Sequence, residues 1–230
     1  LRSCLEGRLT SRIGACDASA YLAALVVDEH TIRVGEAACA IDPLSSQGVQ
    51  TAMRSALQGA IVVHTLLACP ANARAALEFH RRHQTETARR NRAWAAECYA
   101  QPHAFSEHDF WRRRAQPTTG PAAATEWRRN EARLSPDDRV ALSQAAHLAD
   151  TPTIKGELVV SVPSLVHPAL DRPVAYLGDT EVTPLLGEVG RGATARQSNS
   201  GWSRRLPLEE SWRIMTWLWS RGIVVPAGGG

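Results

Sequence analysis

The sequence has few cysteines, and they lack the spacing of a disulfide scaffold or a zinc site. The five cysteines lie far apart, with no CxxC pair among them, and cysteine and histidine never cluster at the spacing of zinc ligands. An odd, scattered set of cysteines is typical of free thiols in a reducing compartment. We therefore predict a cytoplasmic protein without a structural metal.

Long apolar runs and a strong net charge are also missing. The longest apolar stretch, residues 60–68, is interrupted by His64 and Thr65 and is far short of the ~20 residues that a membrane helix needs. The N-terminus has no charged-then-apolar layout of a signal peptide. The net charge of +3 is too small to indicate a nucleic-acid partner by itself. We expect no membrane partner, and a nucleic-acid partner is disfavoured.

What remains is an ordinary globular composition, with 44% hydrophobic and 21% charged residues. Thr31–Ala38 alternates and is rich in β-branched residues, which predicts a short strand. Ile41–Gly48 contains a proline, two serines and a glycine. This composition predicts a loop that leads into a helix, with Ser45 or Ser46 as the N-cap.

Two long helices should follow this loop. Apolar residues recur every three or four positions from Val49 to Leu67, which predicts an amphipathic helix. Pro70 interrupts it, and a second helix rich in Arg and Ala is expected at about residues 71–99. An irregular connector comes next, and the Pro/Gly/Ala/Thr-rich segment Pro117–Thr125 predicts a linker between two domains.

The remaining residues have a different pattern. We predict a helix that begins after Ser135, two short strands within residues 156–179, a helix from Pro207 to Gly222 and a final strand. This order is typical of a small winged-helix-like domain. The predicted fold class is α+β and helix-rich, with a first domain at residues 1–125 and the winged-helix-like domain at residues 126–230.

Val34–Met53 carries the residues with the clearest chemistry. Gly35 would let a ligand approach the backbone, and Glu36 can accept hydrogen bonds from hydroxyl groups. Asp42 precedes Pro43 and is therefore expected to be extended. The start of the helix that follows presents unpaired N–H groups and the positive end of the helix dipole. Such an end stabilises an oxygen that gains negative charge, as the N1/C2 carbonyl side of a reduced flavin does.

The segment GEAACAIDPLSSQG resembles the second FAD motif, GDAA…DP…G, of the flavoprotein monooxygenase superfamily. That superfamily includes aromatic hydroxylases, flavin-dependent tryptophan halogenases and the geranylgeranyl reductase group. The resemblance implies that Gly35 and Glu36 meet the ribityl chain of FAD. It also implies that the residues from the DP pair onward border the isoalloxazine ring: Asp42, Pro43, Leu44, Ser45, Ser46, Gln47, Gly48 and Val49.

Further segments are similar to particular branches of this superfamily. FHRRHQTETARRNRAW and the Phe110-Trp111 pair resemble the halogenase-like branch. DASAYLA and DPLSSQG look most similar to the monooxygenases that mature tryptophylquinone cofactors in quinohemoprotein amine dehydrogenase. The resemblance covers roughly Asp17 to Arg113. It implies hydroxylation of an aromatic substrate, small or a peptidyl tryptophan, through a flavin hydroperoxide, with NAD(P)H as the reductant.

Two departures from the family pattern stand out. The superfamily acid is normally Asp, and Glu36 is one methylene longer. No strand–GxGxxG–helix unit, which holds the FAD pyrophosphate in the family, occurs in this sequence, and the chain does not begin with Met. We therefore expect the distal portion of a Rossmann-type FAD/NAD(P)-binding monooxygenase, a fragment in which no catalytic acid or base can be assigned.

Other functions stay open at this stage. The chain could be a non-enzymatic module that binds protein, through the C-terminal domain, or nucleic acid. It could also be an inactive truncated product. Within the enzymes, a halogenase or an FAD-dependent reductase fits the motif as well as a hydroxylase does.

The remaining side chains favour structural interpretations. Residues 71–115 carry nine Arg against five acids, which favours a solvated helix face with Glu78–Arg82 and Glu86–Arg90 pairs over a phosphate-binding surface. Cys39 is expected to be buried. For five histidines we expect packing or surface roles rather than catalysis: His64, His80, His83, His103 and His108. Three residues of the last helix are expected to form a domain core rather than a docking surface: Trp212, Met215 and Trp219.

Overall fold

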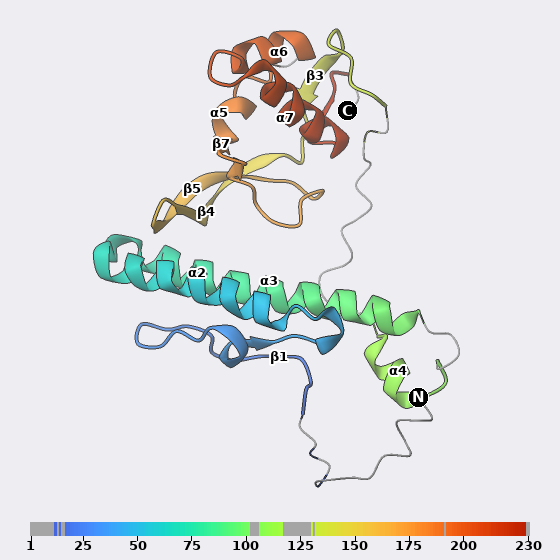
Figure 1. Cartoon of the computed structure of the whole chain (residues 1–230). Coiled ribbons are helices and arrows are strands. Elements are labelled where there is room, and N and C mark those ends of the chain that lie inside the picture. The colour runs from blue at the N-terminus through green and yellow to red at the C-terminus, as the bar shows by residue number, and fades with distance from the viewer. Residues whose placement is uncertain are drawn as a thin grey trace.

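A computed structural model describes residues 12, 14, 17–101, 106–116, 130, 132–190 and 192–228 of the chain. Two long antiparallel helices form its middle, with a small strand pair on one side and a second, strand-containing part on the other (Figure 1). The fold mixes helix and sheet, as predicted. Within the described residues, no helix is long and apolar enough to cross a membrane.

The first strand pair is formed by β1 (Tyr21–Leu22) and β2 (Cys39–Ala40). The strand predicted at Thr31–Ala38 is wrong, because only Ile32 joins a bridge, to Val27. Gly35 has a φ of 56°, which ends the extended backbone, and the 3₁₀ helix η1 (Gly35–Ala37) follows.

The two long helices are confirmed as α2 (Gly48–Ala68) and α3 (Ala73–Ala100), joined by the 3₁₀ helix η3 (Pro70–Asn72). A Cβ atom at Gly59 would lie 2.6 Å from Val34 Cγ1, so this glycine allows the segment before η1 to approach α2. Val62, Ala76 and Phe79 are buried between the helices and the second part of the chain.

The N-cap of α2 differs from the prediction. Ser45 belongs to the 3₁₀ helix η2 (Pro43–Ser45), and Ser46 takes a left-handed conformation with a φ of 51°. Gln47 therefore occupies the N-cap position, and its side chain makes no capping hydrogen bond. The connector after α3 contains the short helix α4 (Asp109–Arg114), and the predicted linker at residues 117–125 lies outside the described residues.

The helix predicted after Ser135 is wrong. Asp138 accepts a hydrogen bond from the Ser135 N–H at 2.7 Å in a turn, and the chain then enters β3 (Arg139–Leu142) and β4 (His147–Lys155). β3 is the central strand of a sheet, between β8 (Ala193–Thr194) and β9 (Val224–Pro226). Pairing on both edges outweighs the local helix signal.

The predicted strands and the last helix are present. β5 (Leu158–Val166) pairs with β4, and a small hairpin joins β6 (Tyr176–Leu177) to β7 (Thr180–Glu181). The helices are α5 (Thr183–Leu186), α6 (Ala195–Trp202) and α7 (Leu208–Ser220). Met215 and Trp219 are buried with Trp202 in one apolar core, so the stripe on the last helix is core. A winged helix has the same element order as α5, β8, α6, α7 and β9. The central strand β3 precedes these helices, however, so the winged-helix-like domain stays a prediction.

The β4–β5 hairpin packs against α2 and α3 (Figure 1). The Val159 N–H donates to Thr65 Oγ1 at 2.9 Å, and the Arg82 guanidinium donates to the Pro152 carbonyl at 2.7 Å. In the described part of the chain, Arg82 thus contacts the hairpin rather than the predicted partner Glu78, and Glu86–Arg90 forms no ion pair.

Candidate functional site

The turn at Gly35 is anchored from behind by buried polar side chains. The Gly35 N–H donates to Ser55 Oγ at 3.1 Å, and the Gln84 amide donates to the same oxygen at 2.9 Å. Ser55 and Gln84 are 4% and 3% exposed. A Cβ atom at Gly35 would lie 3.3 Å from Ala52 Cβ. The glycine is therefore required both for the positive φ and for the close contact with α2.

Glu36 follows this turn with its carboxylate exposed. The backbone carbonyl of Glu36 accepts a hydrogen bond from the Tyr21 hydroxyl, which links the turn to β1. Among the described residues, no hydrogen bond or ion pair engages the Glu36 carboxylate. This carboxylate is therefore available to accept hydrogen bonds from a ligand.

Asp42 holds the next turn in place. It is extended before Pro43, as predicted, with φ −61° and ψ 130°. One carboxylate oxygen accepts from the Leu44 N–H at 3.0 Å and the other from the Tyr99 hydroxyl at 3.1 Å. Burial and the hydrogen bond to Asp42 both raise the pKa of Tyr99, so the phenol keeps its proton and the tether to α3 persists at neutral pH.

The start of α2 carries N–H groups without side-chain caps. Ser45 Oγ accepts from the Gln47 N–H at 3.3 Å, and the Thr51 N–H donates to the Gln47 carbonyl at 2.9 Å. The N–H groups of Gly48 and Val49 fall in the first turn, where no intrahelical acceptor exists. They point along the helix axis toward the loop, so the positive end of the helix dipole meets this region.

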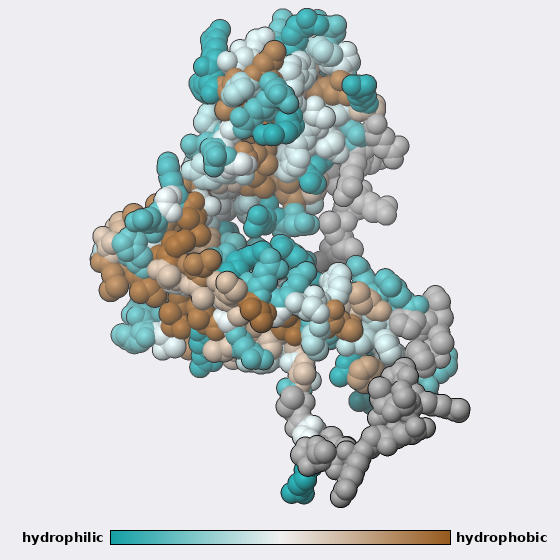
Figure 2. All heavy atoms as spheres, in the orientation of Figure 1, coloured by the Kyte–Doolittle hydropathy of each residue, from teal (hydrophilic) through white to brown (hydrophobic). Residues whose placement is uncertain are grey.

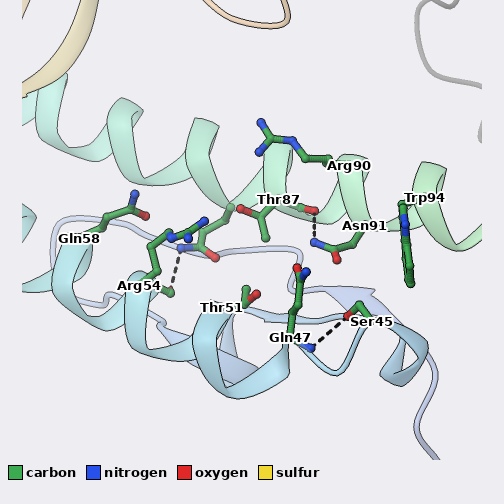
Figure 3. Close-up of a pocket in the computed structure, with 11 residues that line it drawn as sticks. Ser45, Gln47, Thr51, Arg54, Gln58, Thr87, Arg90, Asn91 and Trp94 are labelled. Atoms are coloured by element: carbon green, nitrogen blue, oxygen red, sulfur yellow. Dashed lines mark hydrogen bonds between the residues drawn. The ribbon is translucent and has the colours of Figure 1, made fainter. Parts of the chain in front are cut away.

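The predicted residues are divided among three neighbouring hollows. Glu36, Pro43, Ser46, Gly48 and Val49 line one hollow of about 430 Å³. Asp42 and Pro43 border a second hollow of about 670 Å³. Ser45 and Gln47 line a groove between α2 and α3 (Figure 3). The other predicted residues lie elsewhere: Asp42 lines the second hollow, Ser45 and Gln47 line the groove, and Leu44 is half exposed at the surface. Gly35 lines none of the three hollows and lies against Ala52 of α2 instead.

Sequence reasoning missed the side chains that fix this loop, namely Tyr21, Ser55, Gln84 and Tyr99. Ser55 lies two helical turns after Gly48, on the buried stripe of α2. The hydroxyl of Ser55 at a buried helical position could have indicated a hydrogen-bonding role, because buried polar groups need a partner. The partners of Tyr99 and Gln84 are 57 and 29 residues away, and no local pattern encodes such distances.

The histidines have no catalytic arrangement in the described part of the chain. The His80 Nε2–H donates to the Arg33 carbonyl at 2.8 Å, and burial lowers the pKa of His80. Burial also lowers the pKa of His83 to about 4. His64 is exposed beside Glu157, and His103 lies outside the described residues. These positions agree with packing and surface roles, and no metal-binding cluster occurs among the described residues.

Cys39 is buried, as predicted, and burial raises the pKa of its thiol. The thiol is therefore protonated at neutral pH and acts as a small apolar side chain. Cys39 lies in β2, between the Glu36 turn and the DP turn, and packs in one apolar cluster with Val26 and Val27.

No protein-family model and no curated protein matches the chain. Two solved structures do. One is the peptidyl tryptophan dihydroxylase QhpG, essential for tryptophylquinone cofactor biogenesis, with a TM-score of 0.71 and 25% identity over 96% of this chain and 48% of QhpG. The other is CmlS, a flavin-dependent halogenase, with a TM-score of 0.58 and 18% identity over 92% of this chain and 47% of CmlS.

The fold is of the flavin-dependent monooxygenase and halogenase type. The likeness extends over both parts of the chain, which confirms the resemblance inferred from the motif between Gly35 and Gly48. The chain spans about half the length of these two solved proteins.

Proposed function

We propose that this chain forms the isoalloxazine and ribityl side of the FAD site in a flavoprotein monooxygenase. The observation that carries the proposal is the hollow of about 430 Å³. It is bordered by the free carboxylate of Glu36 on one side and by the uncapped start of α2 at Gly48 and Val49 on the other. These are the two groups that a ribityl chain and an electron-rich ring edge require.

The residues present fit this part of the cofactor. Glu36 can accept hydrogen bonds from ribityl hydroxyls, and the N–H groups of Gly48 and Val49 can donate to the C2 carbonyl side of the ring. Pro43 and Ser46 supply a rigid wall, because proline fixes one backbone angle and η2 holds the left-handed turn after it. Bound flavin would supply the oxygen chemistry, and these residues would hold and orient it.

The two similar structures support a proposal for the substrate class. QhpG acts on a peptidyl tryptophan by its description, and CmlS is a halogenase. We propose hydroxylation of an aromatic substrate, either a small molecule or a peptidyl tryptophan, with NAD(P)H reducing the flavin. The first domain would end near Thr125, and the winged-helix-like second domain would contact the protein partner.

A further part of the enzyme would complete the site. α2 exposes a face of large apolar side chains, which Figure 2 shows as brown surface over the helix. Its members are Val49, Met53, Leu57, Val63 and Leu67, between 38% and 78% exposed. An apolar face of this length marks an interaction surface. We propose that it packs against the protein part that corresponds to the half of QhpG that this chain does not match.

Flavin titration tests the proposal. The chain should quench FMN and FAD fluorescence with weak and similar affinities, because the residues of the hollow meet only the ring and the ribityl chain. Glu36→Gln and Val49→Trp should each weaken binding at least about fivefold, roughly 1 kcal/mol. Glu29→Gln, an exposed acid outside the hollow, is the matched control. No quenching by either flavin up to millimolar concentration, or equal loss in the control, would contradict the proposal.

A further inference from the structure

The short helix α4 forms an aromatic cluster with the end of α3, beside the turn at Asp42 and Pro43 (Figure 1). The Tyr99 ring lies edge-on to Phe110, with centroids 6.0 Å apart, and to Trp111, with centroids 5.6 Å apart. Edge-to-face pairs at such separations are attractive. The Tyr99 hydroxyl donates to Asp42 Oδ2 at 3.1 Å. Ring contacts and this hydrogen bond therefore hold the cluster next to the DP turn.

The Arg114 guanidinium packs on the same cluster. Its Cζ lies 3.9 Å from the Phe110 ring centroid and 5.9 Å from that of Tyr99. A guanidinium over an aromatic face is attracted by the quadrupole of the ring, so these contacts fix the orientation of Phe110. Phe110 is nevertheless 51% exposed. A large part of a held aromatic ring is therefore open to a ligand.

This ring belongs to the wall of the hollow of about 670 Å³, which Tyr99 and Phe110 line together with Pro43. The volume lies within the range of roughly 300–1,000 Å³ that small-molecule pockets occupy. Pro43 and residues 17–19 also line the hollow that we assign to the flavin. The two hollows are therefore neighbours that share part of one wall.

Both carboxylates of this lining are engaged within the chain. Asp42 accepts from the Leu44 N–H and the Tyr99 hydroxyl. Asp17 accepts from the Ser19 N–H at 2.9 Å. The lining therefore offers a cationic ligand no carboxylate without a hydrogen bond.

The arginines of the lining also favour a flat ring. Arg114 lies over the aromatic cluster, and Arg113 pairs with Asp109 at 3.5 Å between nitrogen and oxygen. Within the described residues, Arg92 makes neither an ion pair nor a cation–π contact. Guanidinium groups stack on aromatic faces. The surface left for recognition consists of aromatic rings and one guanidinium, which suits an aromatic ligand.

We propose that the hollow between α4 and the DP turn binds the aromatic ring of the substrate, against Phe110 and Tyr99. The assignment to the substrate rests on the proposed flavin site, because the shared wall at Pro43 sets this ring beside the isoalloxazine. Phe110 is then a specificity-determining residue, which selects a flat ring through ring-to-ring contact. Binding of the ring itself requires no flavin, so it is measured on the chain alone.

Fluorine NMR of 5-fluoroindole, titrated with the 230-residue chain, tests the proposal. The fluorine signal should shift or broaden and saturate at about millimolar concentration. Unlabelled indole should reverse the change, and the aliphatic ring of cyclohexanol should not. Phe110→Leu should weaken binding about fivefold, because an aromatic pair contributes more than its buried area, and Phe110→Tyr should retain it. Trp94→Leu, at a ring that is 41% exposed outside this hollow, is the matched control.

Four outcomes would overturn the proposal: no binding, equal displacement by indole and cyclohexanol, unchanged binding in Phe110→Leu, or an equal loss in Trp94→Leu. A loss in Phe110→Tyr as large as in Phe110→Leu would do the same, since the tyrosine keeps the ring. Circular dichroism confirms that every variant is folded.

Saturating FMN separates this proposal from that of the flavin site. 5-Fluoroindole should stay bound when FMN is added, and Glu36→Gln should not change its affinity, because the hollows are neighbours and not one site. Displacement by FMN would place the ring in the flavin hollow and overturn this inference, with the flavin site intact. Binding of 5-fluoroindole that depends on Phe110, without any binding of FMN, would instead contradict the flavin site and with it the assignment of the ring to a substrate.

Discussion

Ser55 accepts hydrogen bonds from the part-buried Gly35 N–H and the buried Gln84 amide, and so connects the Gly35 turn to both long helices. Ser55→Ala leaves both donors without an acceptor, and each unpaired buried group costs about 1–3 kcal/mol. We expect the variant to lose about 2 kcal/mol of unfolding free energy in urea titrations and to bind FMN more weakly. Ser200→Ala, which removes an exposed helix hydroxyl, should change stability by less than about 0.5 kcal/mol. Equal stability of the two variants would contradict the anchoring role.

His83 provides a pH-dependent test at the same scale. Burial lowers its pKa to about 4, and its Nδ1 accepts from the Gln58 amide, which requires a neutral ring. The unfolded chain, with an ordinary histidine pKa near 6.5, binds more protons between pH 6.5 and 4. Stability from this group is therefore complete above about pH 6.5 and is lost as the pH falls toward 4, by up to about 1.4 kcal/mol per unit.

Thermal unfolding between pH 7 and pH 4.5 checks this dependence. His83→Gln should flatten the acid slope relative to the unmodified chain, and the exposed His64→Gln should keep it. An identical slope in all three proteins would show that burial of His83 does not govern acid stability.

The candidate site was predictable where local order encodes chemistry. The sequence indicated Gly35, Glu36 and the DP pair as candidates, because a glycine, an acid and a proline each restrict or enable local backbone and hydrogen-bond geometry. The N-cap was not predictable, since Ser46 enters the left-handed region and moves the start of α2 to the residue after Gln47. Tyr99 and Gln84 could not be found, because tertiary packing alone brings them to the loop.

At the scale of elements, length decided what the sequence could predict. α2, α3 and α7 have 21, 28 and 13 residues, long enough for the helical period to dominate the pattern. β3 has 4 residues, too few for alternation to be recognised. Its conformation depends on β8 and β9, which lie more than fifty residues later, so the helix predicted from Ser135 and Pro136 was overridden by sheet pairing.

The exposed apolar face of α2 gives a prediction of its own. Leu57 and Leu67 are 70% and 78% exposed, so replacing them removes surface rather than core. Leu57→Gln and Leu67→Gln together should lower the fluorescence of a bound apolar dye such as ANS, with the melting temperature nearly unchanged. Leu208→Gln, at an exposed leucine outside the face, should leave the dye signal unchanged. Unchanged ANS binding in the double variant would show that the apolar face of α2 is not a binding surface for the dye.

At the scale of the whole molecule, the β4–β5 hairpin joins the predicted domains. Val159 is fully buried against Val62 and Phe79, and its N–H reaches Thr65. The segment from η1 to η2 and the β4–β5 hairpin therefore contact opposite sides of one helix pair (Figure 1). A composition shift at residues 117–125 indicated a boundary, but a contact between β5 and α2 across more than ninety residues had no sequence signal.

Amide chemical-shift mapping tests the central claim most directly, because it locates a bound flavin on the chain itself. FMN added to the labelled protein should shift the signals of Glu36, Ser46, Gly48 and Val49, while those of the α6–α7 core stay in place. Shifts confined to other surfaces, or none at these four residues at millimolar FMN, would contradict the assignment of this hollow to the isoalloxazine and ribityl chain.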